Sequence, residues 1–332
     1  MRRFAKCGCA ALLIFAAACQ PKTTEPAAEE AASSDAPDLA AATSALPVAH
    51  ILLGKLTAPA GEDSYSVVEI EPILAAPTYQ NQPTFFGSGQ SQFYFVAGNA
   101  NGKTDLWSYN LASGERIQIT NTLEKSEFSP KPAPDGGVSF IQESEDGAMT
   151  RVHALAAPGE PGAAVIETGP VGYYEWLQGG AIVAVFYRSE PPALQLVDVA
   201  SGEAREVFPN VGRILLVSPD GETLFATRAD DAGQYEIVAV DAASGVTESL
   251  LDLPPGAQDF FLTFGPEGLP AVAFSSAETR LMTFDLARDD VWHVAADIAA
   301  LGYGSITRVA VSGAIDEDGN RPIVFVAHPR DE

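Results

Sequence analysis

The chain has 332 residues, of which 19 are Lys or Arg and 44 are Asp or Glu, giving a formal net charge of −25 at pH 7. Such an acidic protein repels nucleic acid and anionic lipid surfaces, so both classes of partner are excluded. Basic proteins and divalent cations are permitted as partners, although acidity is also a common device for solubility.

The first 19 residues, MRRFAKCGCAALLIFAAAC, have the layout of a secretory signal peptide. Basic residues precede an apolar run over residues 10–15, which is too short to span a membrane, and small residues follow. Residues 16–19 resemble the lipobox of bacterial lipoproteins, in which the cysteine becomes the lipidated first residue of the mature chain. We predict a signal peptide over 1–18 and lipid attachment at Cys19. An ordinary signal cut at an Ala-x-Ala site is the alternative.

The cysteine content agrees with this prediction. Cys7 and Cys9 leave with the signal peptide, and Cys19 is the last cysteine of the chain. The mature protein then has no pair of thiols for a disulfide, so its stability must come from the hydrophobic core. Removal of three basic residues with the signal changes the net charge from −25 to about −28.

Residues 19–45 are predicted to be a disordered tether. They are rich in Ala, Pro, Glu and Ser and have almost no large apolar side chains to bury. As a flexible coil this segment would hold the following domain on the order of 30 Å from the membrane. Gln20, directly after the cysteine, implies by resemblance to bacterial lipoproteins that the protein is retained in the outer membrane and faces the periplasm.

The folded domain is expected over 46–332 and is organised by a repeated unit that is clearest in residues 212–251. Four short apolar runs in this stretch are bounded by turn residues, and Ser218-Pro219-Asp220-Gly221 closes the first pair. Pro presets φ in such a turn, and Gly accepts the positive φ that other residues resist. The unit is therefore predicted to be a four-stranded antiparallel sheet.

Two features of this unit recur along the chain. The glycines of the first turn are residues 89, 136, 180, 221, 268 and 319. The matching positions of a later strand are residues 109, 153, 197, 240 and 284, spaced by 44, 44, 43 and 44. A period of roughly 40–50 residues with four strands per unit is typical of a β-propeller.

The chain ends supply the last unit. Two strands, 50–56 and 66–74, precede the first complete unit, and two more, 305–311 and 322–327, follow the fifth. An open ring would leave unpaired strand edges, which closure removes. We therefore predict an all-β fold, a closed six-bladed β-propeller with four-stranded antiparallel blades. Its last blade takes inner strands from the C-terminus and outer strands from the N-terminus. The five complete blades are expected near residues 79–121, 124–168, 171–208, 210–252 and 256–296.

The repeats resemble a known family. Residues 119–122 (ITNT) followed by 129–136 (SPKPAPDG) are similar to the TolB-type WD-repeat-like unit, and 105–111 (DLWSYNL) with 113–115 (SGE) match its later strand and turn. The resemblance covers roughly residues 80–330 and implies a six-bladed propeller in the cell envelope. TolB itself carries an α/β domain before its propeller, where this chain has only the tether, so the resemblance does not imply a role in the Tol system.

Catalytic and metal-binding motifs are scarce. The chain has no Gly-x-Ser-x-Gly elbow and no mature cysteine besides Cys19, so we predict that it is not an enzyme and needs no cofactor. His50 and His328 are expected as neighbours in the closing blade, but two histidines do not complete a metal site. His153 and His293 fall in strands of different blades, as packed or rim residues.

One cluster of oxygen-bearing side chains stands out. Asp316, Asp318 and Asn320 alternate as ligands do in calcium loops, but a strand begins at Pro322, before any bidentate Glu. A solvated hairpin turn is therefore favoured over a calcium site, which is the weaker alternative.

A binding surface is predicted where the loops before the innermost strands surround one mouth of the channel. The residues expected there are Tyr79, Glu127, Tyr173, Tyr174, Trp176, Asp259 and Tyr303. Tyr and Trp are favoured anchors at protein interfaces. Core packing is the alternative for each residue, and the two carboxylates are expected either to line the channel or to be solvated.

These features favour a monomeric, lipid-anchored propeller that binds another envelope protein as a scaffold. An accessory role in outer-membrane protein assembly is a special case that follows from the resemblance alone. An enzyme, or a binder of a sugar or peptide at the channel mouth, is the alternative, because a fold does not dictate function.

Overall fold

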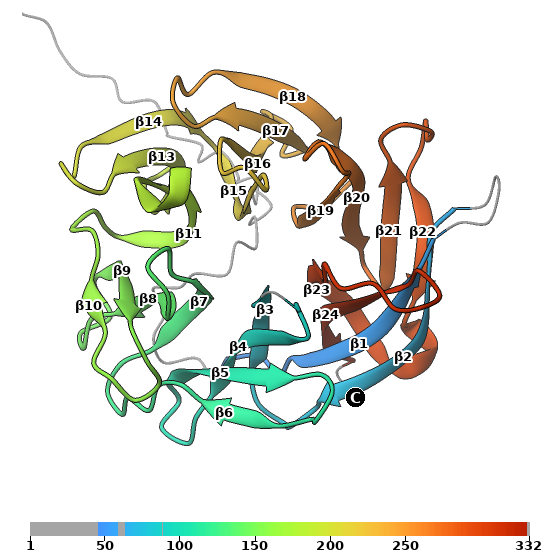
Figure 1. Ribbon diagram of the computed structural model, residues 1–332, viewed down its shortest axis with the longest axis horizontal. Coiled ribbons are helices and arrows are strands. Elements are labelled where there is room, and N and C mark those ends of the chain that lie inside the picture. The colour runs from blue at the N-terminus through green and yellow to red at the C-terminus, as the bar shows by residue number, and fades with distance from the viewer. Residues whose placement is uncertain (1–45, 59–63, 88, 331–332) are drawn as a thin grey trace, which may run out of the picture. The chain divides into compact units, whose positions relative to one another are not determined.

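The computed structural model describes residues 46–58, 64–87 and 89–330 (Figure 1). The predicted signal peptide, Cys19 and the tether over 19–45 lie outside the described residues. Within the described ranges, no helix has the length and apolar character needed to cross a membrane.

Six four-stranded antiparallel sheets form a ring, as the repeats predicted (Figure 1). The first blade consists of β3 (Gln80–Phe86), β4 (Gln92–Gly98), β5 (Thr104–Asn110) and β6 (Arg116–Gln118). The second consists of β7 (Glu127–Pro132), β8 (Val138–Glu143), β9 (Thr150–Leu155) and β10 (Ala163–Ala164). The third consists of β11 (Val171–Leu177), β12 (Ile182–Tyr187), β13 (Ala193–Asp198) and β14 (Ala204–Pro209). The fourth consists of β15 (Val211–Val217), β16 (Thr223–Ala229), β17 (Tyr235–Asp241) and β18 (Thr247–Asp252). The fifth consists of β19 (Phe260–Phe264), β20 (Pro270–Ala277), β21 (Arg280–Asp285) and β22 (His293–Asp297).

The sixth blade joins the two ends of the domain, which confirms the predicted closure. Its strands are ordered β2 (Ser66–Leu74), β1 (His50–Thr57), β24 (Arg321–Pro329) and β23 (Tyr303–Val311). β1 pairs with β24 without interruption from His50 opposite Ala327 to Leu56 opposite Arg321. This ladder pairs strand edges that an open ring would expose.

The hydrophobic core lies between the faces of neighbouring blades. One cluster joins the third and fourth blades through Leu196, Leu224 and Val240, and another joins the sixth and first through Val324 and Phe93. The second strands are therefore buried on both faces and read as continuous apolar runs, whereas the outermost strand β6 is exposed throughout. The six inner strands remain to line the channel.

In several blades the turn between the third and fourth strands begins with Asp or Asn and has Gly four residues later, as at Asp198 and Asp241. In the fourth blade Asp241 Oδ1 accepts a hydrogen bond from the backbone N–H of Ser244 at 2.6 Å, and the N–H of Gly245 donates to the carbonyl of Asp241 at 2.8 Å. Gly245 has φ +74°, a left-handed conformation that favours glycine. The same geometry recurs 43 residues earlier at Asp198 and Gly202.

Gly212 on β15 is required by close packing against its partner strand. A Cβ atom at this position would lie 1.9 Å from Thr227 Oγ1. We expect Gly212→Ala to lower the free energy of unfolding by about 1–3 kcal/mol, because the added methyl group forces the strands apart. Urea unfolding measures the change, and Gly265→Ala, which meets only a backbone oxygen at 3.8 Å, is the control. Equal losses in the two variants would contradict this explanation.

Candidate functional site

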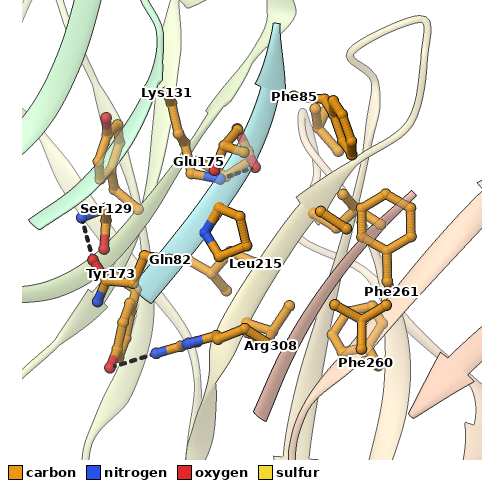
Figure 2. Close-up of a pocket in the computed structure, with 18 of the residues that line it drawn as sticks. Gln82, Phe85, Ser129, Lys131, Tyr173, Glu175, Leu215, Phe260, Phe261 and Arg308 are labelled. Atoms are coloured by element: carbon orange, nitrogen blue, oxygen red, sulfur yellow. Dashed lines mark hydrogen bonds and ion pairs between the residues drawn. The ribbon is translucent and has the colours of Figure 1, made fainter. Parts of the chain in front are cut away.

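A cavity of about 490 Å³ lies in the central channel, and all six inner strands contribute to its wall (Figure 2). Its lining includes Thr84 on β3, Lys131 on β7 and Val311 on β23. The volume falls in the range of roughly 300–1,000 Å³ typical of small-molecule sites.

The inner strands are irregular where they reach the cavity. Gln82, Ser129 and Arg308 have φ of 57°, 53° and 54°, a left-handed conformation that is uncommon for residues other than glycine. Pairing with the second strand shifts register beside each of them, as in a β-bulge, which redirects side chains. The N–H of Ser129 donates to Gln82 Oε1 at 2.6 Å and links the first two blades. Backbone strain of this kind is concentrated at functional sites.

A buried ion pair lies beside the cavity. Arg213 donates from Nε to Asp259 Oδ1 and from Nη2 to Asp259 Oδ2, both at 2.6 Å, and the backbone N–H of Arg308 donates to the same Oδ2 at 3.3 Å. Burial alone would raise the pKa of Asp259, but the attraction and hydrogen bonds of Arg213 outweigh it, so this pKa lies below its ordinary value. Asp259 is therefore a structural anion whose negative charge is compensated by Arg213.

Arg308 crosses the channel. Its Nη2 donates to the hydroxyl of Tyr173 at 2.9 Å, and its guanidinium lies 4.9 Å from the centroid of the Tyr173 ring (Figure 2). Arg308 is on β23 of the sixth blade and Tyr173 on β11 of the third, and these blades are opposite one another in a ring of six. The contact therefore ties together two sides of the channel.

A second ion pair and an apolar wall complete the lining. Lys131 Nζ donates to Glu175 Oε2 at 2.7 Å, and Glu175 Oε1 accepts from the N–H of Trp176 at 3.0 Å. Figure 2 shows Phe85 and Phe261 on the side of the cavity away from these polar groups. The cavity thus has a polar side and an apolar side.

The structure separates the seven residues predicted for the channel mouth. Tyr173 and Trp176 line the cavity, and Tyr174 lies in its wall but is only 1% exposed, whereas Tyr79, Glu127, Asp259 and Tyr303 do not line it. Burial raises the pKa of Tyr79, and the positive charges of Arg308 and Arg213 offset part of this effect. The hydroxyl of Tyr303 shares a hydrogen bond of 3.1 Å with His50 Nδ1 in the closing blade.

The expectation that Glu127 and Asp259 either line the channel or are solvated is wrong for both. Their exposed fractions are 0% and 4%, because Asp259 is held by Arg213 and Glu127 lies between the first two blades. Glu127 Oε1 accepts from Thr122 Oγ1 at 2.6 Å and from Gln142 Nε2 at 3.2 Å. Burial raises the pKa of Glu127 to about 7 in spite of these hydrogen bonds.

Tyr174 and Trp176 share one polar partner in the core. The Tyr174 hydroxyl and Trp176 Nε1 each donate to Ser139 Oγ at 2.8 Å. We expect Ser139→Ala to lower the free energy of unfolding by about 1–3 kcal/mol, because it leaves two donors without their acceptor. Chemical denaturation measures the loss, and Ser113→Ala in an exposed turn is the control. An unchanged stability of Ser139→Ala would show that other acceptors replace the hydroxyl.

Two of the remaining candidates, His50 and His328, have hydrogen-bond partners in the closing blade. His328 Nε2 forms a hydrogen bond of 3.0 Å with Thr307 Oγ1, and burial lowers the pKa of both His328 and His50. His153 packs in β9, and His293 lies on β22 in another blade. Among the described residues, no group of three or more His, Cys, Asp or Glu is arranged to hold a metal ion.

The acidic cluster forms the hairpin between β23 and β24. Asp316 Oδ1 accepts from the backbone N–H groups of Asp318 and Asn320 at 3.0 and 2.7 Å, and its Oδ2 accepts from Asn320 Nδ2 at 3.2 Å. The side chain of Asp316 thus stabilises the exposed turn, which is the reading that the sequence favoured.

Several lining residues had not been predicted from the sequence: Gln82, Ser129, Lys131, Glu175, Arg213 and Arg308. The available signal was a charged residue within an otherwise apolar inner strand, as in Arg213 of VGRILLV and Arg308 of YGSITRVAV. Such a residue cannot be buried without a partner, so it points toward a channel or an ion pair.

The fold is a TolB-like six-bladed propeller, in agreement with the resemblance of its repeats. No protein-family model matches the chain, and no curated protein matches its sequence. Among solved structures, TolB from Acinetobacter baumannii is similar with a TM-score of 0.53 and 12% identity, over 83% of this chain and 63% of that one. This chain therefore matches less than two thirds of that structure.

Two further structures cover most of both chains. A protein from Agrobacterium tumefaciens provisionally named TolB has a TM-score of 0.58 and 14% identity, over 85% of this chain and 99% of that one. A gluconolactonase from Xanthomonas campestris has a TM-score of 0.50 and 11% identity, over 76% and 86%. At these identities the likeness establishes the fold, and the function must be argued from the site.

Proposed function

We propose that this chain is a lipid-anchored, periplasm-facing propeller that acts as a non-enzymatic, protein-binding scaffold in the bacterial cell envelope. The observation that carries the proposal is a TolB-like ring that follows a predicted signal peptide, in which Ala16-Ala17-Ala18 directly precede Cys19. In this proposal residues 1–18 are the signal peptide, Cys19 carries the lipid in the outer membrane, and 19–45 tether a monomeric propeller over 46–332.

The partner is proposed to dock at the channel. Tyr173 and Trp176 offer large aromatic surfaces beside the cavity, as interface anchors do. Tyr79, Tyr174, Asp259 and the other buried members of the predicted set would position these anchors without touching the partner. The strongly negative charge of the chain favours a basic partner and fast association with it.

Two measurements test the anchor and the partner separately. Cys19→Ala is expected to move the protein from the membrane fraction to the soluble periplasm, and a protein that stays in the membrane fraction would contradict the lipid anchor. A photo-cross-linking residue at Trp176 is expected to capture a defined envelope protein. The same residue at Ile117, exposed on the outermost strand β6, is the control, and equal adducts from both positions would contradict docking at the channel.

The second candidate function, an enzyme or small-ligand binder, is favoured by the cavity itself. The volume of about 490 Å³ lies within the range typical of small-molecule sites, and two ion pairs provide polar groups beside it. Incubation of the full chain with a panel of sugar lactones and peptides tests for turnover. Turnover that is lost in Lys131→Met would favour this candidate over the scaffold.

A further inference from the structure

The cavity carries an excess of positive charge within a strongly acidic chain. Its neighbourhood contains Lys131, Arg213 and Arg308 as cations, and Glu175 and Asp259 as anions. Lys131 pairs with Glu175, and Arg213 pairs with Asp259. One positive charge is therefore left uncompensated, although the whole chain carries a net charge of −25.

The uncompensated charge is that of Arg308. Its guanidinium donates to the uncharged hydroxyl of Tyr173, and in the described part of the chain no carboxylate lies within ion-pair distance of it. Both carboxylate oxygens of Asp259 accept hydrogen bonds from Arg213, and Oδ2 also accepts one from the backbone N–H of Arg308. Asp259 therefore does not pair with the guanidinium of Arg308. A guanidinium has five N–H donors, so most of those on Arg308 have no acceptor among the residues that the structure describes.

The placement of Arg308 is costly for the fold. A half-buried cation without an anion loses hydration that its surroundings do not replace. Arg308 also has a left-handed backbone at φ 54°, which a bulge in β23 imposes. An anion in the cavity would offset the lost hydration of the guanidinium. The bulge, which imposes the strained backbone, directs the Arg308 side chain across the channel.

We propose that the cavity binds a carboxylate that is attached to an apolar body, with Arg308 as its charged partner and the Tyr173 hydroxyl as a second donor. A single uncompensated positive charge matches a monoanion, whereas a phosphate dianion would add excess negative charge beside Glu175 and Asp259. The planar fork of a guanidinium also fits a carboxylate in a bidentate manner.

The wall that carries Phe85 and Phe261 selects the rest of the ligand. These two side chains line the cavity on the side away from the Lys131–Glu175 pair (Figure 2), so an aromatic or aliphatic group would be buried there. A free organic acid and the C-terminal residue of a peptide both have this chemistry. The inference goes beyond the proposed scaffold function, since it needs neither the lipid anchor nor a protein partner.

Calorimetric titration of the full chain tests the proposal with four probes. These are 3-phenylpropionate, its neutral amide, and the tetrapeptide Ala-Ala-Ala-Phe with a free or an amidated C-terminus. We expect at least one free carboxylate to bind, and its amide to bind about tenfold more weakly or worse, because a hydrogen-bonded charge is lost. If only 3-phenylpropionate binds, the natural ligand is a free organic acid. If only the tetrapeptide with a free carboxylate binds, the natural ligand is the C-terminus of a peptide.

Arg308→Gln supplies the matched variant. It is expected to weaken binding of the carboxylate probe at least about tenfold. Arg151→Gln, which changes an arginine paired with Glu167 on the outer part of the second blade, is expected to bind as the wild type does. The proposal is overturned if neither carboxylate binds to the wild type, if acid and amide bind equally, or if Arg308→Gln binds unchanged. If Arg308→Gln does not fold, the comparison of acid with amide on the wild type still tests whether the cavity recognises a carboxylate.

Discussion

Asp259→Ala is expected to lower the free energy of unfolding by about 3–5 kcal/mol. The substitution leaves the guanidinium of Arg213 buried beside the channel without the two hydrogen bonds of 2.6 Å that now compensate it, and Arg308 lies nearby with no other carboxylate. An unpaired buried cation costs more than an ion pair contributes, so the loss exceeds that of an ordinary surface substitution. Urea unfolding at neutral pH measures it.

Two comparisons test this explanation further. Asp135→Ala, in an exposed turn, is expected to change the stability by less than about 0.5 kcal/mol. The double variant Arg213→Met with Asp259→Leu is expected to recover much of the loss, because it removes both charges and keeps apolar volume. A double variant as unstable as Asp259→Ala would show that the carboxylate acts through contacts other than Arg213.

The pH dependence of Asp259 has a definite sign. Its pKa is depressed in the folded protein, so its contribution to stability is present above the unfolded pKa of about 3.9 and is lost as the pH falls below that value. The acid limb of the stability profile should therefore be shallower in Asp259→Ala than in the wild type. Parallel acid limbs would indicate that Asp259 titrates normally.

Glu127→Gln is expected to change the pH dependence of stability in the opposite direction. Burial raises the pKa of Glu127 from 4.5 to about 7, so the folded protein binds a proton there that the unfolded chain has released. The associated stability is complete below about pH 4.5 and is lost as the pH rises through 7, a difference of about 3 kcal/mol. Glutamine mimics the protonated side chain, so the variant should keep this stability at high pH.

Chemical denaturation at pH 4.5 and pH 8 checks the prediction. The wild type and Glu127→Gln should be similar at the lower pH, and the variant should be more stable by about 3 kcal/mol at the higher pH. Glu167→Gln, with a side chain that is 87% exposed, is the control and should follow the wild type at both values. A constant difference between Glu127→Gln and the wild type across this range would mean that Glu127 is ionised throughout.

The sequence by itself determined the architecture. Turn chemistry at Ser218-Pro219-Asp220-Gly221 and the spacing of the later strands are local properties, and their repetition leaves few arrangements besides a ring. The closing blade could also be predicted, because the strands over 50–56 and 322–327 would otherwise end as open edges. These inferences needed no knowledge of which residues from different blades meet.

The site was decided only by the tertiary structure. Tyr173 and Arg308 are 135 residues apart and meet because the third and sixth blades face each other across the axis. Neighbouring tyrosines differ as well, since Tyr173 faces the channel while Tyr174 donates to Ser139 in the core. Bulges in the inner strands shift the two-residue alternation that would otherwise assign each side chain to a face. For that reason the sequence predicted the ring, and only the tertiary structure showed that Arg308 reaches Tyr173 across the channel.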